Sequence, residues 1–400
     1  MSQVLEVVQC DETAGAEVGG TNIVGGLMVS GRADARRHFE ALTDPRRGQV
    51  KYPLVNVMVM TLCAVISGAD DFVAVAFWAG KNRAWLEQFL DLSSGIPSHD
   101  CFNSIFARLS PAEFQQCLLN WITALHEVTG GQVIAIDGKT LRRSFDKASS
   151  KSAIHMVSAF ATASRISLGQ VVTDAKSNEI TAIPKLLDIV TVQGAVVTID
   201  AMGCQTEIVD KITSQGAVAC IAVKTNQPKL HAAIAGHFDQ LIEDGLDEAN
   251  ARRASTRDHG HGREEHRSYV ICPVPASVKE LGRWKHVRAI GMATSVITRD
   301  GKEHTGVRYY ILTRYLSGRR FAEAARGHWG IENSLHWQLD VTFGEDQCRI
   351  RKGHADANFS LIRRFALGML KNEKSAGVGI KNKRLLAAWD QQYLAKVLFG

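Results

Sequence analysis

Three changes in the pattern of hydrophobic and polar residues divide the chain. Residues 1–30 are rich in glycine and show little periodicity, which predicts a loose N-terminal arm. From 31 to 128 apolar residues recur at helical spacing, and from 129 to 375 short apolar runs alternate with helical stretches. Residues 376–400 are helical in pattern and basic. We therefore expect an arm, a helical domain, an α/β domain and a basic helical tail.

Residues 31–128 predict a helical domain with a buried core. The run Leu54–Gly68 is the most apolar in the chain, but it is too short to span a bilayer and contains polar residues, so we expect a buried helix after Pro53. Ser98 is a suitable N-cap for a later helix. Helices on either side of the turn Gly95–Pro97 are compatible with a DNA-binding helix-turn-helix and, more commonly, with an ordinary helical connection.

The α/β pattern begins with three consecutive strands, Val133–Asp137, Ile154–Ala161 and Arg165–Thr173. Helices and strands then alternate, and the fourth strand is Ala195–Asp200. Three meandering strands followed by this alternation form a mixed sheet covered by helices, in the order of a ribonuclease H-like fold. The first and fourth strands can be neighbours in that order.

The stretch from about 250 to 315 interrupts the alternation. It begins with a highly charged segment, residues 252–267, that is typical of a flexible polar loop; a metal or phosphate site in its GHGREEHR run is the less common alternative. Three strand-like runs follow. We therefore expect a mostly β insertion within the α/β domain.

Three acidic residues carry the clearest chemical signal. Asp137 and Asp200 each end a short apolar strand, and Glu332 is on a helix far downstream. A lone aspartate after a strand is commonly a turn residue or a helix cap, but two of them at corresponding strand ends favour a shared site. Three carboxylates suffice to hold two Mg²⁺ ions, with Mn²⁺ as a substitute, because Mg²⁺ keeps several waters and binds phosphate oxygens. Such a site cuts and joins phosphodiesters, with water or a DNA hydroxyl as the nucleophile.

Other ligands and acids are compatible with parts of this pattern. His328 and His336 lie four residues before and after Glu332, so the three side chains share one helix face and a zinc site is an alternative. Ligands at this spacing span two turns and rarely converge on one ion. If Glu332 is not the third acid, the next candidates are Asp340, Glu345 and Asp346.

Basic and amide side chains follow the two strand ends. A basic cluster follows Asp137 along the chain and consists of Lys139, Arg142, Arg143, Lys147 and Lys151. Three polar donors follow the fifth strand, and these are Lys224, Asn226 and Gln227. These side chains can hold DNA phosphates or lie in solvated loops. Trp284, Trp329 and Trp337 can stack on an unpaired base, although packing in the core is more common.

The net charge is +6, and its distribution is uneven. From Arg351 to Gly400 there are ten Lys or Arg and three Asp or Glu, so the preceding 350 residues sum to −1. A phosphate-binding surface and a solvated basic face both explain this. Eight scattered cysteines without a CxxC pair, and no signal-peptide pattern at the N-terminus, predict a reduced cytoplasmic protein without a membrane segment.

From residue 36 to 400 the chain resembles the H-repeat-associated family of DDE-type insertion-sequence transposases. The resemblance rests on long motifs in order, among them HFEALTDPRR, GIPSHDCFNSIFARLSP, AIDGKTLRRS, KSNEITAIP, TIDAMGCQ, NQPKL and HWGIENSLHWQLDVTFGEDQCRIR. It implies an N-terminal transposase-associated domain, then a ribonuclease H-like catalytic domain in which Asp137, Asp200 and Glu332 are the acidic triad and metal ligands. Wider relatives carry a Tyr, Arg, Glu, Lys signature around the glutamate, and here Ala325, His328 and Leu339 stand at the other three positions.

The resemblance further implies a metal-dependent transposase that binds the terminal inverted repeats of its element in double-stranded DNA. It nicks the ends and joins the 3′ hydroxyl to target DNA, as a homodimer in the synaptic complex and associated with the nucleoid. A DNA hairpin intermediate occurs in relatives with a β insertion. The residues expected to contact DNA are Lys139, Arg142, Arg143, Lys224, Asn226, Gln227, Arg326, His328, His336, Arg349 and Arg351. The alternatives are an inactive DNA-binding relict or repressor of the same fold, and a structure-selective nuclease.

Overall fold

The computed structural model describes residues 22–24, 27–29, 34–125, 132–145, 153–173, 179–245, 250–260 and 263–399. The predicted arm over residues 1–30 falls largely outside these ranges, and only the short paired strands β1 (Asn22–Val24) and β2 (Leu27–Val29) are described in it. Among the described residues, no helix is both long and apolar enough to cross a membrane.

The helical region follows the predicted pattern. Its helices are α1 (Ala35–Phe39), α2 (Leu54–Ile66), α3 (Phe72–Lys81), α4 (Arg83–Leu86), α5 (His99–Arg108) and α6 (Pro111–Leu125). The apolar run forms α2, and all of its residues except Val55 are buried. The Ser98 hydroxyl accepts a hydrogen bond from the Cys101 N–H and caps α5, which confirms the predicted N-cap.

The structure does not support a helix-turn-helix at the Gly95–Pro97 turn. Residues 87–98 separate α4 from α5, whereas that motif joins two helices by a turn of about three or four residues. The apolar side chains of α5, including Phe102 and Phe106, are buried, and the helix packs on α11 (Ala355–Asn372). Its apolar residues therefore serve the core.

The described strands β3–β11 form one nine-stranded mixed sheet in the order β5-β4-β3-β6-β7-β11-β10-β9-β8. Strands β3 (Val133–Thr140), β4 (His155–Ala161) and β5 (Ile166–Thr173) form an antiparallel meander, while β6 (Val196–Ile199) and β7 (Val218–Val223) continue it in parallel. The first and fourth strands of the α/β region, β3 and β6, are neighbours as the sequence predicts.

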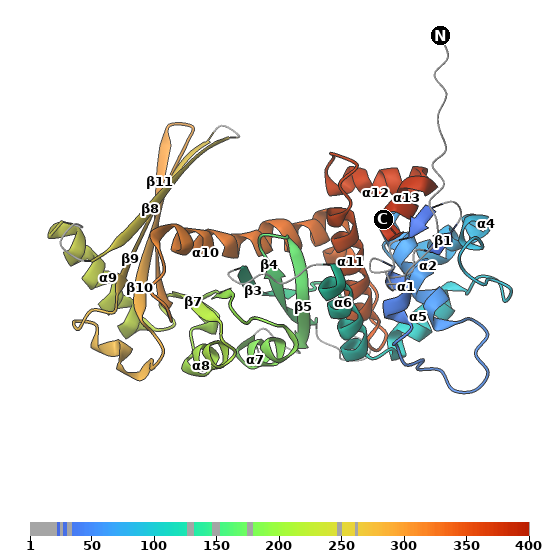
Figure 1. The fold of residues 1–400 in the computed structure, drawn as a ribbon, viewed down its shortest axis with the longest axis horizontal. Coiled ribbons are helices and arrows are strands. Elements are labelled where there is room, and N and C mark those ends of the chain that lie inside the picture. Colours follow the sequence, from blue (N-terminus) through green and yellow to red (C-terminus); the bar gives the residue numbers. More distant parts are fainter. Residues whose placement is uncertain are drawn as a thin grey trace, which may run out of the picture.

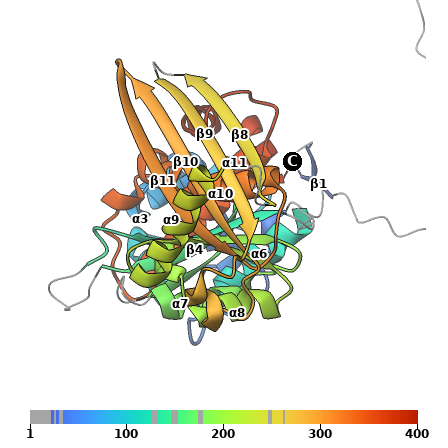
Figure 2. The same ribbon diagram turned by 90° about the vertical axis from the view of Figure 1, so that its left-hand side faces the viewer.

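The inserted strands extend the same sheet. Strand β11 (Lys302–Leu312) pairs antiparallel with β7, and β10 (Ala289–Arg299), β9 (Arg263–Pro273) and β8 (Arg252–Gly260) follow it. The long hairpins of this half project beyond the body of the molecule (Figures 1 and 2). The prediction of a polar loop over residues 252–267 was wrong, because the described part of this segment lies in β8 and β9. Nearly all side chains in this part of the two strands are polar or charged, including the buried Glu265, so no hydrophobic alternation marks the strands.

Helices cover the two faces of the sheet. Helix α10 (Gly318–Ile331) runs along one face over β3 and β6, while α7 (Glu179–Ile189) and α8 (Thr206–Ser214) lie on the opposite side (Figure 1). Gly327 permits the close approach of α10, since a Cβ there would lie 3.1 Å from Val133 Cγ1. Helix α9 (Pro228–Glu243) follows β7 and packs on β11.

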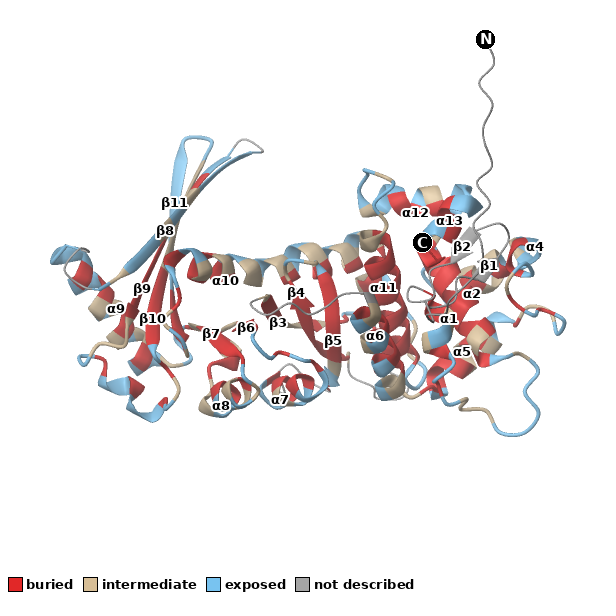
Figure 3. Cartoon of the chain, in the orientation of Figure 1, coloured by how far each residue is buried: buried red, intermediate tan, exposed pale blue. Residues whose placement is uncertain are grey.

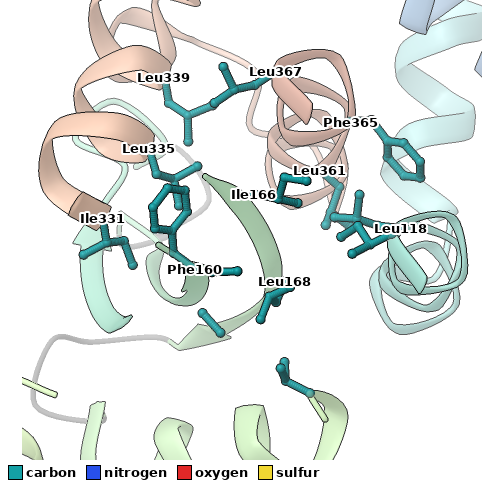
Figure 4. Packing of buried hydrophobic residues seen from close by; sticks show 14 of the residues in the cluster. Leu118, Phe160, Ile166, Leu168, Ile331, Leu335, Leu339, Leu361, Phe365 and Leu367 are labelled. Carbon is teal, nitrogen blue, oxygen red and sulfur yellow. The ribbon is translucent and has the colours of Figure 1, made fainter. Parts of the chain in front are cut away.

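The C-terminal helices belong to the core. Every residue of α11 up to Leu370 is buried, and this helix packs between α2, α5, α6 and β5 (Figures 3 and 4). Helices α12 (Ile380–Trp389) and α13 (Gln391–Phe399) pack on α2. The basic stretch is therefore neither a free tail nor a single solvated face: Arg363, Arg364, Lys383 and Arg384 are buried.

Candidate active site

Asp137 and Asp200 lie side by side at one edge of the sheet. Strands β3 and β6 run parallel with Ile136 opposite Ile199, and each aspartate is the next residue along its strand. Strand β3 continues to Thr140 because β4 still pairs with it, whereas β6 ends at Ile199. The Asp200 carboxylate accepts the Met202 N–H at 3.0 Å and so caps the short turn Ala201–Gly203.

Glu332 reaches this edge from the helix above the sheet. Helix α10 ends at Ile331, and the backbone continues as two π-helical turns, Glu332–His336 and Gln338–Thr342. Helical turns of this type are frequent at functional sites. Glu332 is exposed, whereas His336 is buried, so the regular α-helical stripe expected from the sequence does not continue past Ile331.

The three acids interact electrostatically. Burial raises the pKa of Asp137 to about 7, and the charges of Asp200 and Glu332 add to this rise. Within the described residues, no Lys or Arg forms a salt bridge with Asp137, Asp200 or Glu332. The described part of the chain therefore gives these three carboxylates no Lys or Arg as a direct ion-pair partner.

The two histidines near Glu332 face the protein interior. His336 Nδ1 lies 3.5 Å from Asp137 Oδ2, and His328 Nδ1 lies 3.4 Å from the Thr198 hydroxyl. Burial lowers the pKa of both, that of His336 to about 3 with further contributions from Lys139 and Arg364. Both imidazoles are neutral at pH 7, so the structure gives no charged phosphate contact at either position.

The structure does not support the alternative of a zinc site in the described part of the chain. No three His, Cys, Asp or Glu side chains lie together there in a way that can hold one ion. His336 turns towards Asp137, and His328 towards Thr198, rather than towards each other across Glu332.

Lys139 points inward, in contrast to its expected role at the DNA surface. It follows Asp137 by two residues on β3, so both side chains leave the same face of the sheet. Its buried ammonium contacts the Asp340 carboxylate and lies 2.8 Å from Glu345 Oε2. Lys139 thus joins the segment after Glu332 to the strand that carries Asp137.

Glu345 is the centre of this buried ionic group. It also accepts a hydrogen bond from the Ser360 hydroxyl at 2.6 Å and lies 3.3 Å from Arg364 on α11. Burial alone would raise the pKa of Glu345, but Lys139 and Arg364 outweigh it and hold the pKa well below its usual range. The negative charges of Asp340 and Glu345 are therefore balanced by Lys139 and Arg364 within the protein.

The donors after β7 also turn towards the site. Asn226 Nδ2 donates to the Ala201 carbonyl at 2.6 Å, and Gln227 Nε2 donates to the Cys204 carbonyl at 2.9 Å. They brace the turn that Asp200 caps, in place of the predicted DNA contacts. Lys224, in the same loop, is exposed.

A buried pair next to Asp137 was not predicted from the sequence. His155 Nε2 lies 2.6 Å from Glu179 Oε1 on the other face of β3, and a Cβ at Gly138 would come within 2.5 Å of both groups. Gly138 is therefore required by this pair. The only sign of this pair in the sequence is the glycine that directly follows Asp137.

The remaining predicted cations lie on the surface. Arg142, Arg143 and Arg349 are exposed, Arg351 is half-buried, and Arg326 forms a 2.5 Å salt bridge with Asp258. Lys147 and Lys151 lie outside the described residues. Among the tryptophans, Trp284 is buried, while Trp329 is 41% and Trp337 52% exposed.

A groove of about 720 Å³ runs between the inserted strands and α10. It is lined by Arg263, Arg267, Arg308, Arg326 and Trp329, among other residues. The Arg308 guanidinium lies 4.2 Å from the centre of the Trp329 ring, and Trp329 is one helical turn before Glu332. An exposed aromatic ring beside cations is suited to a nucleic acid strand.

Comparisons with known proteins match most of the chain. The family model "Transposase DDE domain" matches residues 129–369, and "DDE_Tnp_1-associated" matches residues 36–122. The chain is 41% identical over 369 residues to the "H repeat-associated putative transposase YhhI" of Escherichia coli K12, covering 91% of this chain and 97% of that protein. It is 39% identical over 357 residues to the "Putative transposase YncI" of E. coli O157:H7, covering 88% and 91%.

Proposed function

The chain belongs to the transposase DDE domain family, and on that premise we propose that it is an active DNA transposase. In this proposal it binds the terminal inverted repeats of its own insertion sequence, cuts the DNA at those ends, and joins the freed 3′ hydroxyl to target DNA. Two copies hold two ends in a synaptic complex, at the nucleoid of the bacterial cytoplasm.

The observation that carries this proposal is the electrostatic coupling of Asp137, Asp200 and Glu332. Burial and two neighbouring acids raise the pKa of Asp137 to about 7, which is unfavourable for a structural carboxylate and favourable for one that binds a cation. The strand order β5-β4-β3-β6-β7 supports a ribonuclease H-like catalytic core, with the acids at the edge where β3 and β6 meet.

The three acids offer oxygen ligands suited to Mg²⁺, with Mn²⁺ as a substitute. Mg²⁺ binds through one or two carboxylates together with water and substrate phosphates, so two acids per ion suffice and no three-ligand cluster is needed. Bound in this way, divalent ions activate the attacking oxygen and stabilise the leaving oxygen. The protein holds Asp200 by its turn and Asp137 by its strand.

The surface near the acids supports DNA binding. Arg142, Arg143, Lys224, Arg349 and Arg351 provide cations around the edge of the sheet. On the other side, Trp329 and Arg308 line the groove beside Glu332, where an unpaired base can stack. Lys139, Asn226, Gln227, His328 and His336 are left out of this surface because they make the internal contacts described above.

The test is cleavage and joining of a linear DNA that carries the element's ends, with Mg²⁺ and a second DNA as target. We compare the wild type with Asp137→Asn, Asp200→Asn and Glu332→Gln, and with Asp239→Asn on α9 as an exposed control. The proposal predicts that both reactions are lost in the first three variants and kept in the control.

Other results identify the alternatives. Cutting without joining indicates a structure-selective nuclease, and binding to the ends without cutting by any variant indicates a relict or repressor. Retained activity in Glu332→Gln alone shifts the third acid to Asp340, Glu345 or Asp346.

A further inference from the structure

A second cavity lies where the helical region meets the segment that follows the acids. It has a volume of about 840 Å³. One wall comes from the starts of α3 and α5, with Phe72, His99 and Asn103, and the other from residues 344–353, with Arg349, Arg351 and Lys352. We call this cavity the basic cleft. The family models match its walls separately, one to the associated region and the other to the DDE domain.

Two of the three cations of the basic cleft face solvent, whereas its two acids make contacts within the protein. Arg349 and Lys352 are exposed, and within the described residues neither forms a salt bridge. In contrast, the Asp70 carboxylate lies 3.1 Å from the buried Arg384, and that of Asp71 caps α3 through the Ala74 N–H at 2.8 Å. The cleft therefore presents net positive charge to solvent.

The basic cleft is continuous with the strand that carries Asp137. Arg351 Nε donates to the Arg143 carbonyl at 3.1 Å, and its guanidinium lies 5.2 Å from the Phe145 ring. Arg142, beside Arg143, lies 3.5 Å from Asp346. Five cations thus extend from the end of β3 into the cleft: Arg142, Arg143, Arg349, Arg351 and Lys352.

We propose that the basic cleft binds the phosphate backbone of duplex DNA next to the point of cleavage, with the helical region supplying one of its walls. The inference rests on the proposed function and adds where the duplex lies and what the associated region does. Arginine and lysine contacts to phosphate position a duplex without reading its sequence. The helical region thereby contributes to DNA binding without a helix-turn-helix.

The chain length between Asp137 and Arg143 sets the position of this contact. Six residues of extended chain cover at most about 20 Å, and successive phosphates of one strand are about 3.4 Å apart along the duplex. Arg143, at the start of this row of cations, therefore meets the DNA within about six base pairs of the cut, and the cleft follows next to it through Arg351.

The main test is the salt dependence of binding to a duplex with the element's end. The double variant Arg349→Ala/Lys352→Ala is compared with Lys185→Ala/Lys229→Ala, which removes two exposed charges from α7 and α9. Each lost phosphate contact lowers the slope of log affinity against log salt by about 0.9. We expect a slope smaller by about 2 and an affinity reduced about tenfold or more at moderate salt, with little change in the control.

A second variant tests the helical wall. His99→Glu places a negative charge in the cleft at the first turn of α5, where an acid favours the helix, so folding is maintained. His99→Gln is its neutral control. The proposal predicts weaker DNA binding for His99→Glu and binding close to wild type for His99→Gln.

Trimming the DNA distinguishes the element side of the cut from the flanking side. When the side that occupies the cleft is shortened to fewer than about six base pairs, the double variant and the wild type should bind the DNA with the same affinity.

The proposal for the cleft is overturned if the double variant keeps the wild-type salt slope and His99→Glu keeps the wild-type affinity. End cleavage by the wild type would then leave the proposed function standing. A wild type that binds no duplex at low salt overturns both.

Discussion

Two groups of carboxylates lie on the same face of the sheet, and they differ in the source of their counter-charge. Asp340 and Glu345 contact the ammonium of Lys139, and Glu345 also lies beside Arg364. Asp137, two residues before Lys139 on β3, faces Asp200 and Glu332 instead. The pKa of Glu345 is lowered and that of Asp137 is raised.

The source of the counter-charge distinguishes carboxylates that stabilise the fold from carboxylates that are suited to bind a metal ion. Buried acids with built-in cations hold segments together, here the stretch after Glu332 against β3 and α11. Acids that repel one another without a basic partner, such as Asp137, favour binding of a cation from outside, and substitution there is expected to change the chemistry of the site. Substitutions in the two groups should therefore have opposite effects on folding.

The largest expected change in stability is that of Glu345→Gln. It leaves the buried Arg364 without a carboxylate partner and Lys139 with Asp340 alone, and breaking a buried ion pair in this way typically costs about 3–5 kcal/mol of the free energy of unfolding. Glu323→Gln, which removes an exposed pair with Arg319 and Arg320, should cost about 1 kcal/mol or less. Denaturant unfolding measures both, and equal effects would remove the distinction between buried and exposed acids.

Asp137→Asn should stabilise the protein above neutral pH. Because the folded-state pKa of Asp137 is raised to about 7, the wild type takes up a proton on folding between about pH 4 and 7, and this contribution to stability is lost as pH rises through 7. The rise corresponds to at most about 4 kcal/mol. In metal-free buffer, thermal unfolding should show the variant more stable than the wild type at pH 8, with a difference that shrinks as the pH falls and disappears near pH 4. A variant destabilised at pH 8 would contradict the raised pKa.

Asn226→Ala should slow the reaction with little effect on DNA binding. The substitution removes the brace on the turn after Asp200, and a misplaced acid of this kind costs roughly ten- to a hundredfold in rate. Lys224→Ala in the same loop is the matched control, because the exposed lysine should affect DNA affinity and its salt dependence but leave the rate at saturating DNA unchanged. The reverse result would assign Asn226 to the DNA surface.

The sequence was sufficient for the parts of the fold and site that rest on local pattern. Apolar runs marked β3 and β6, and their order along the chain predicted that they are neighbours. The Ser98 cap and the buried helix α2 were also readable, because a single side chain or one apolar run determines each.

Contacts between distant residues could not be predicted in the same way. Lys139 meets Asp340 and Glu345 across more than 200 residues, so a lysine next to an acid looked like a phosphate contact. Arg363 and Arg364 looked like part of a basic surface for the same reason. Strands β8 and β9 were missed in their charged part because nearly all side chains there are polar or charged, so the hydrophobic alternation that identifies a strand is absent.

In the proposed function, the carboxylates of Asp137, Asp200 and Glu332 take their counter-charge from divalent cations. Calorimetric titration of the DNA-free protein with Mg²⁺ and Mn²⁺, in the wild type and Asp137→Asn, tests it most directly. We expect the wild type to bind the ions in the titration and to unfold at a higher temperature in their presence, and the variant to lose both effects. No binding to the wild type, or equal binding to the two proteins, would contradict it.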